Sequence, residues 1–249
     1  MIMTTIASQI HRVQAQIHDA CQKANRPPAS VDLLAVSKTF PAQAVREAAL
    51  AGQRAFGENY IQEAVEKIAA IQVMPDVPAL TWHCIGPIQS NKTKLVAQHF
   101  DWAHTVDREK IAQRLHDQRP ANLPPLQVCI QVNVDGGETK SGCNAQEAVA
   151  LARAIAQMPR LTLRGVMSIP DAQPTEAQTL AVHRKVVAVF EQIRSAGIEG
   201  LAHFDTISLG MTADMSAAIA AGSTMVRVGS GVFGARDYGA KVSSADMGA

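Results

Sequence analysis

The chain has 249 residues, 47% of them apolar and 18% charged, which is the composition of an ordinary globular protein. Its 23 basic and 22 acidic side chains give a net charge of +1, so no broad charged surface for nucleic acid or anionic lipid is expected. No apolar run approaches the roughly 18 residues that span a bilayer, and the first twenty residues lack the pattern of a signal peptide. We therefore expect one cytoplasmic domain over residues 1–249.

The first predicted element is an amphipathic helix over residues 4–25. Its apolar stripe consists of Ile6, Ile10, Val13 and Ile17. The sequence Arg-Pro-Pro at 26–28 ends this helix, because proline cannot continue the hydrogen-bond ladder.

Short apolar segments with strand character then alternate with segments of helical periodicity. The expected strands are Asp32–Ser37, Arg54–Glu58, Thr81–Ile85, Trp102–Val106, Leu126–Asn133, Leu161–Ser168, Asp205–Leu209 and Met225–Gly229. The expected helices span 42–51, 60–72, 91–99, 108–118, 145–157, 175–195 and 212–221.

Strands that are joined through helices run parallel, and eight such units match a (β/α)8 barrel in number and length. The alternative is an open doubly wound sheet, which would have a glycine-rich turn after its first strand. Here the first strand ends in Ser37-Lys38-Thr39 instead. The sequence therefore predicts a single α/β domain, a (β/α)8 TIM barrel with an extra helix at its amino terminus. The segment after Tyr238 has the composition of a disordered tail.

Cysteine and histidine spacing argues against a metal or disulfide framework. The cysteines are Cys21, Cys84, Cys129 and Cys143. They form no CxxC pair, so free thiols are expected. His83, His104 and His203 follow no ligand spacing either.

Lys38 is the first candidate for chemistry, because barrel proteins carry their sites at the carboxyl ends of the strands. It directly follows the first apolar strand. Burial there would lower the pKa of its amine and let the neutral form attack a carbonyl, giving a Schiff base. A strand-end lysine that merely reaches into solvent is the alternative.

Two glycine- and serine-containing segments follow the seventh and eighth strands, where barrels commonly bind phosphate. Ser208-Leu209-Gly210-Met211 leads into a predicted helix, and Gly229-Ser230-Gly231 offers a second set of backbone amides. Either segment alone could be a helix cap. A Schiff-base lysine facing a phosphate site suggests the cofactor pyridoxal 5′-phosphate (PLP).

Arg227 precedes the second of these segments on a strand that should be buried. A buried arginine needs a partner, which is either a carboxylate in the core or the pyridine nitrogen of PLP. Arginine would keep that nitrogen unprotonated and so weaken the ring as an electron sink.

Six segments resemble those of the pyridoxal phosphate homeostasis proteins, a PLP-binding family, in the correct order from about residue 5 to 238. They are residues 35–39 (AVSKT), 56–63 (FGENYIQE), 82–92 (WHCIGPIQSNK), 208–215 (SLGMTADM), 221–230 (AGSTMVRVGS) and 233–236 (FGAR). The family commonly has Gly-Thr-Ala where this chain has Gly229-Ser230-Gly231. The serine keeps the hydroxyl, and the extra glycine loosens the backbone.

The resemblance implies a barrel like the N-terminal domain of alanine racemases, with a role for each matching residue. Lys38 would carry PLP as a Schiff base, and Arg227 would face the pyridine nitrogen. Ser208, Gly210, Gly229 and Ser230 would hold the phosphate. Asn59 and His83 would line the ring pocket, with Ser168 and Met211 at its edges. Lys92, Lys94 and Lys140 receive no firm role.

The resemblance further implies a carrier that regulates vitamin B6 and amino-acid balance, with apo-PLP enzymes as possible recipients. A racemase needs a second acid/base, which alanine racemases take from a tyrosine of an additional domain. Only Tyr60 and Tyr238 occur here, and little chain follows the last strand. We therefore expect a monomer without a full catalytic apparatus, and no catalytic residue is assigned. A PLP-dependent racemase or decarboxylase is the alternative, and a Schiff-base aldolase is a third.

Overall fold

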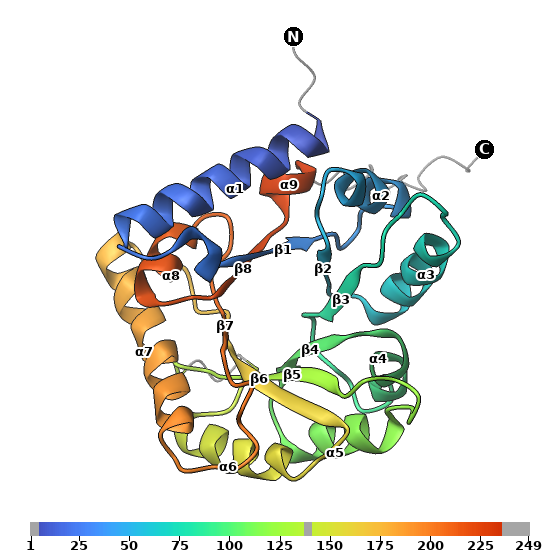
Figure 1. Ribbon diagram of the computed structural model, residues 1–249. Helices are drawn as coiled ribbons and strands as arrows, with labels where there is room; N and C mark the ends of the chain where they lie inside the picture. Colours follow the sequence, from blue (N-terminus) through green and yellow to red (C-terminus); the bar gives the residue numbers. More distant parts are fainter. Residues whose placement is uncertain (1–4, 137–140, 236–249) are drawn as a thin grey trace, which may run out of the picture.

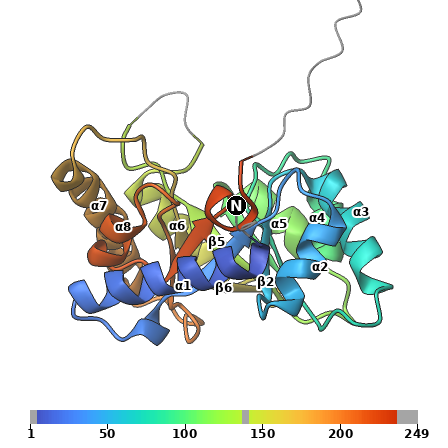
Figure 2. The same cartoon turned by 90° about the horizontal axis from the view of Figure 1, so that it is seen from above.

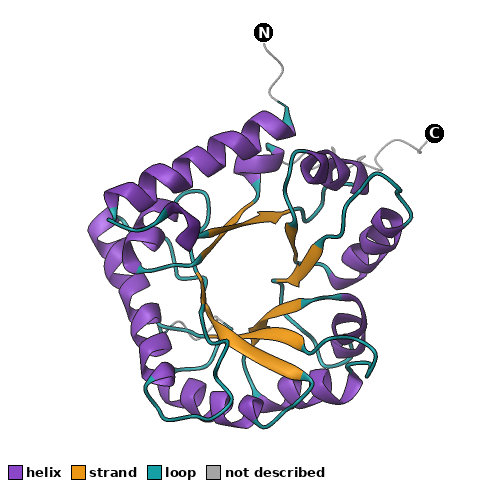
Figure 3. Cartoon of the chain, viewed as in Figure 1, coloured by secondary structure: helices purple, strands orange, loops and turns teal. Residues whose placement is uncertain are grey.

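The computed structural model describes residues 5–136 and 141–235, which form one closed barrel of parallel strands inside a ring of helices (Figure 1). Each strand pairs in parallel with the next along the chain, and β1 closes the barrel against β8. In Figure 3 the strands form the inner ring and the helices the outer one. The predicted (β/α)8 barrel is confirmed.

The bounds of the elements follow the predicted segments closely. The strands are β1 (Asp32–Val36), β2 (Ala55–Glu58), β3 (Thr81–Cys84), β4 (Trp102–Val106), β5 (Leu126–Gln131), β6 (Leu161–Met167), β7 (Thr206–Ser208) and β8 (Met225–Val228). The helices are α1 (Ile6–Lys23), α2 (Ala42–Leu50), α3 (Ile61–Gln72), α4 (Thr93–His99), α5 (Glu109–Gln118), α6 (Ala145–Ala156), α7 (Glu176–Arg194), α8 (Met215–Ala221) and α9 (Ser230–Phe233).

Two departures from the predicted elements fall close to the candidate site. Helix α8 begins at Met215 rather than at Thr212, because residues 212–214 form a turn. Residues 230–233, which the sequence suggested to be a glycine-rich loop, form the short helix α9. The tail after Tyr238, expected to be disordered, lies outside the described residues.

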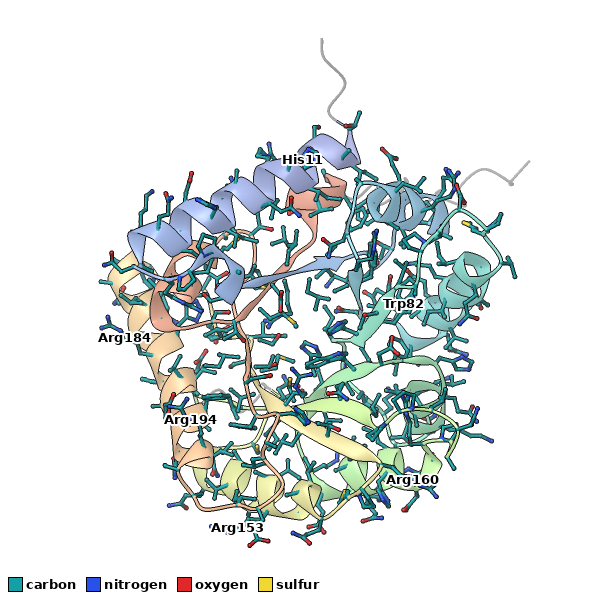
Figure 4. All side chains as sticks on the ribbon, in the orientation of Figure 1. His11, Trp82, Arg153, Arg160, Arg184 and Arg194 are labelled. Carbon is teal, nitrogen blue, oxygen red and sulfur yellow. The ribbon has the colours of Figure 1, made fainter. Side chains whose placement is uncertain are left out.

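The core is divided by the strands into two layers. One layer fills the space between strands and helices, where alternate strand residues such as Ala35, Phe56 and Ala103 pack against the helices. The other lines the inside of the barrel, in two clusters. These are Leu34, Val36, Ile85 and Met225, and Trp102, Cys129 and Met167. The side chains in Figure 4 fill the ring accordingly, whereas the labelled Arg153 and Arg194 lie on the periphery.

Helix α1 packs outside the junction where the first and last strands of the barrel meet. Its buried stripe includes Ile10, Val13 and Ile17, as its periodicity predicted, and it contacts α2, α8 and α9. Figure 2 shows it crossing the outer surface of the barrel. The Thr5 side chain caps its start by accepting a hydrogen bond from the Ser8 amide (3.2 Å).

Two further expectations concern the membrane and the cysteines. Among the described residues, no helix is long and apolar enough to cross a membrane. The four cysteines are free thiols, as predicted, and all are buried.

Candidate functional site

Lys38 lies two residues after the end of β1, on a turn that packs against α9. The aromatic rings of Phe40 and Phe233 stack with their centroids 5.1 Å apart. A Cβ atom placed on Gly229 would lie 3.4 Å from the carbonyl oxygen of Val36, the last residue of β1. The predicted lysine and the second glycine-serine segment are therefore neighbours at the carboxyl end of the barrel.

Arg227 lies inside the barrel, on the strand that pairs with β1. It is buried, and its guanidinium donates to the Ser208 carbonyl (2.6 Å), to Ser208 Oγ (2.8 Å) and to the Ser168 carbonyl (2.8 Å). None of the ion pairs among the described residues includes Arg227, so the carboxylate partner that the sequence left open is not there. The cation is held by carbonyl and hydroxyl oxygens alone.

A chain of hydrogen bonds continues from Arg227 across the barrel interior. Ser208 Oγ lies 3.0 Å from Nδ1 of His104, and Nε2 of His104 lies 2.9 Å from Nδ1 of His83. Because Ser208 Oγ accepts from Arg227, its own proton is free to be donated to His104. Nε2–H of His104 then donates to His83, an order assigned from the network as a whole.

Both histidines in this chain are neutral at physiological pH. Burial, with a contribution from the charge of Arg164, lowers the pKa of His83 to about 3. Burial also holds the pKa of His104 well below its usual value, assisted by His83 and Arg227. Burial lowers the pKa of Arg227 to about 10, which leaves it charged at neutral pH. The site therefore holds one cation and a row of neutral dipoles.

His83 lies within β3, one residue before the strand ends at Cys84. Its ring stacks on Trp102, with centroids 5.0 Å apart and planes 16° from parallel. Both rings also line a cavity of about 530 Å³ at the amino-terminal end of the barrel, together with Asp32 and Met225. His83 thus reaches Arg227 only through His104 and Ser208, and its role in a ring pocket stays a prediction.

The segment after β7 takes a different form from the helix start that was expected. Gly210 has a φ of +92°, and its carbonyl accepts from the Arg227 amide (3.0 Å). The Asp214 carboxylate accepts from the Met211 amide (2.6 Å), which holds the turn before α8. Met211 is 43% exposed at this rim, whereas Ser208 is fully buried.

Two more predicted residues lie at the carboxyl ends of other strands. Ser168 follows β6, where its hydroxyl donates to the Val132 carbonyl (2.8 Å) and its own carbonyl accepts from Arg227. Asn59 follows β2 and is partly buried, with its backbone against Gly86. A Cβ on Gly86 would come within 2.1 Å of the Asn59 carbonyl oxygen, so only glycine fits there.

The remaining lysines are distributed differently. Lys92 and Lys94 lie at the start of α4, and no hydrogen bond or ion pair of the described residues joins them to the Arg227 network. Lys140 lies outside the described residues. Within residues 5–136 and 141–235, no group of histidine, cysteine and acidic side chains could hold a metal ion, and His83 and His104 bond to each other instead.

The sequence analysis missed two features of the site. It considered His104 only as a metal ligand, although it is the central link between His83 and Ser208. It assigned no role to Glu58, whose carboxylate accepts hydrogen bonds from Ser37 and Lys67. Alternation along β3 and β4 was the available signal for the histidines; no pattern along the chain indicates the pairing with Lys67.

Comparison with known proteins places this barrel among close relatives. A sequence model described as the alanine racemase N-terminal domain matches residues 9–237. The pyridoxal phosphate homeostasis protein of Pseudomonas aeruginosa is 55% identical over 241 residues, covering 97% of this chain and all of that one. The protein of the same name from Escherichia coli is 51% identical over 239 residues, covering 96% of this chain and all of that one.

Solved structures agree with this placement. The structure of PipY from Synechococcus elongatus with PLP bound has a TM-score of 0.80 at 35% identity, covering 92% of this chain and all of that one. An alanine racemase of Clostridium difficile has the same fold, with a TM-score of 0.67 at 13% identity over 90% of this chain but only 56% of the racemase. On this identity over nearly its full length, the chain belongs to the family of pyridoxal phosphate homeostasis proteins, built on the alanine racemase N-terminal domain.

Proposed function

We propose that the chain holds PLP at the carboxyl end of its barrel and serves as a carrier that regulates the supply of this cofactor and amino-acid balance. Lys38 is the amine to which PLP attaches covalently, as a Schiff base. When bound, PLP supplies an aldehyde that a lysine amine can attack and a ring that accepts electrons. The remaining site residues bind and orient this group.

The observation that carries the proposal is Arg227. A cation inside a barrel without a carboxylate partner is costly, so it needs a reason beyond the fold. It lies on β8, which pairs with the strand that leads to Lys38. Its planar guanidinium suits a ring nitrogen that accepts a hydrogen bond, and the neutral His104 and Ser208 orient the guanidinium without neutralising it.

The phosphate would lie at the start of α9. The first amides of a helix, here those of Ser230 and Gly231, have no acceptor within it. Gly229 keeps the space beside Val36 free of a side chain, and the Ser230 side chain is exposed. Together with Gly210 and the backbone after β7, these groups suit a dianion beside Lys38. The edges of the cofactor ring would be contacted by Asn59, Ser168 and Met211. The hydrogen-bond chain that ends at His83 would hold Arg227 in place.

The relatives support the cofactor and the carrier role. PipY, at 35% identity, was solved with PLP bound, and the curated relatives of the same length bear the name of homeostasis proteins. The racemases are distant in sequence and longer, so their likeness supports the fold alone. Racemisation would need a second acid/base, and Tyr60 is the one tyrosine within the described residues. Tyr60 is 56% exposed. We infer a monomeric carrier that supplies apo-PLP enzymes, with a racemase or decarboxylase as the alternative.

The cofactor assignment is tested by reduction and peptide mapping. Protein incubated with PLP is expected to show a visible absorbance band, and borohydride should bleach it and fix a pyridoxyl label on Lys38. Lys38→Ala serves as the control for nonspecific labelling. Label recovered chiefly on Lys92, Lys94 or Lys140 in the wild-type protein would contradict the assignment.

The carrier role is tested with L-alanine. Absorbance of the PLP-loaded protein is followed while D-alanine is measured by chiral separation. A spectral change without D-alanine is expected, because general acid–base help worth roughly 10²–10⁴ in rate is missing from one face. Turnover on the order of 1 s⁻¹, the low end for ordinary enzymes, would instead identify a racemase.

A further inference from the structure

A cluster of charged side chains, two of them buried and one partly exposed, lies between β2 and α3, outside the barrel wall. It consists of Glu58, Glu63 and Lys67, which we call the Lys38 clamp. The Lys67 ammonium donates to Glu58 Oε1 (2.6 Å) and to Glu63 Oε1 (3.0 Å). Glu63 and Lys67 are one helical turn apart on α3, whereas Glu58 ends β2.

The clamp bonds the two peptide groups that flank Lys38. Lys67 gives its third hydrogen bond to the Ser37 carbonyl (2.8 Å), which belongs to the peptide group before Lys38. Glu63 accepts from the Thr39 amide (2.7 Å), which belongs to the peptide group after it. The backbone of Lys38 is thus fixed on one side by Lys67 and on the other by Glu63.

The turn that is fixed in this way is strained. Thr39 has a φ of +69°, a left-handed conformation that is unfavourable for a β-branched residue. Such conformations persist only where the surrounding structure imposes them, and they are concentrated at functional sites. The Phe40 amide closes the turn by donating to the Ser37 carbonyl (3.1 Å), so this oxygen accepts from both Phe40 and Lys67.

The clamp also contains a buried ion pair, whose desolvation costs free energy of folding. The side chains of Lys67 and Glu58 are nearly inaccessible, with exposures of 4% and 0%. Burial raises the pKa of Glu58, and its second oxygen, Oε2, has no hydrogen-bond partner among the described residues. Buried ion pairs can often be replaced by apolar side chains without loss of stability, so stability alone is a weak reason for this one.

We propose that the Lys38 clamp positions Lys38 for attachment of PLP, with Lys67 and Glu63 holding the strained turn that directs its amine to the barrel mouth. Glu58 balances the charge of Lys67 and binds the Ser37 hydroxyl (2.6 Å). This inference rests on the proposed function, because it assigns the clamp a role only if Lys38 is the attachment point. Lys67 and Glu63 act on Lys38 through hydrogen bonds to its flanking peptide groups, so they are positioning residues.

The test compares the double variant Glu58→Gln, Lys67→Met with the wild-type protein. Lys67→Met alone would leave Glu58 buried and unpaired and so destabilise the fold. The double variant removes both charges, keeps similar volumes and leaves an amide that still accepts from Ser37. Arg119→Met is the matched control, since Arg119 is also a buried cation that binds carbonyls, those of Ala97, Phe100 and Pro124, away from Lys38.

Three measurements are made on each protein: the thermal midpoint without PLP, the dissociation constant for PLP, and amide hydrogen exchange over residues 37–40. In the double variant we expect a midpoint close to wild type, faster exchange at these residues, and PLP binding weakened roughly 5- to 30-fold, the factor that ordering one residue's backbone corresponds to. In Arg119→Met the midpoint should fall while PLP binding changes less than about 2-fold, because it lies away from Lys38.

The outcomes separate this inference from the proposed function. Unchanged PLP affinity and unchanged exchange in the double variant, beside a wild-type protein that is labelled on Lys38, would overturn the clamp and leave the proposed function standing. A wild-type protein that takes no label on Lys38 would overturn both. A double variant whose thermal midpoint falls together with its affinity for PLP would also count against positioning, because the clamp would then stabilise the fold as a whole.

Discussion

Replacing Arg227 by methionine tests whether this residue serves to bind a ligand or to stabilise the fold. Lowering the pKa of Arg227 from 12.5 to about 10 corresponds to a burial cost of about 3 kcal/mol for the cation. Methionine removes this cost. It leaves the Ser168 carbonyl without its Arg227 donor, which costs about 1–3 kcal/mol. The Ser208 carbonyl still accepts from the Ser168 amide (3.3 Å).

These two quantities nearly cancel, so the free energy of unfolding of the ligand-free variant should lie within ~2 kcal/mol of the wild-type value. For a chain of this size, that corresponds to a change of at most about 4–8 °C in the thermal midpoint. A hydrogen bond from a charged group contributes about 1.5–3 kcal/mol, so PLP affinity should fall roughly 10- to 150-fold. Unfolding followed by circular dichroism and titration with PLP measure the two quantities. A loss of stability above ~4 kcal/mol with unchanged PLP affinity would refute the reasoning and make Arg227 a structural residue.

Three further predictions concern pH, packing and thiol reactivity. Because the pKa of His83 is about 3 in the fold and near 6.5 unfolded, its contribution to stability is complete above pH 6.5 and is lost as the pH falls. Stability measured by urea unfolding between pH 6 and 5 should therefore fall about 1.4 kcal/mol per pH unit less steeply in His83→Gln. Gly86→Ala should move the backbone at Asn59 and weaken PLP binding in the same titration, whereas Gly52→Ala, with nothing within 4 Å of its added Cβ, should leave binding unchanged. A thiol reagent at pH 8 should find no fast-reacting cysteine, since burial raises the pKa of Cys84 and Cys129 to about 12; rapid labelling of either would contradict their burial.

The barrel and its chemical end could be predicted from the sequence because both depend on local patterns. Parallel strands joined by helices place all carboxyl ends on one side, so Lys38, Ser208 and Gly229 were found by reading only those positions. The chain of hydrogen bonds that runs from Arg227 across the barrel interior to His83 could not be predicted in this way. Strand alternation puts His83 and His104 on possible inward faces, but their 2.9 Å contact depends on the stagger between β3 and β4.

The Lys38 clamp was harder still to predict. Glu63 and Lys67 form an ordinary helix pair by spacing, which by itself predicts a solvent-exposed contact of little energy. The burial of Lys67 depends on the packing of α3 beside the ends of β1 and β2, where Lys67 bonds Ser37 and Glu58, and no local pattern encodes this packing. Helix α9 was missed for a related reason, because the sequence Gly-Ser-Gly favours a turn until Phe233 packs on Phe40.

The position of α1 has a consequence for how the protein is made. The apolar stripe that contains Ile10, Val13 and Ile17 leaves the ribosome before any strand of the barrel, but two of the helices it packs against, α8 and α9, are the last of the barrel to be synthesised. Strand β1 waits equally long for β8. Contacts between such distant parts of a chain form slowly, and unpaired strand edges and exposed apolar faces promote aggregation in the meantime. Until α8, β8 and α9 are made, the nascent chain therefore carries an amphipathic helix whose apolar face is only partly covered and an open sheet edge, and a shortened product that lacks these three elements keeps both.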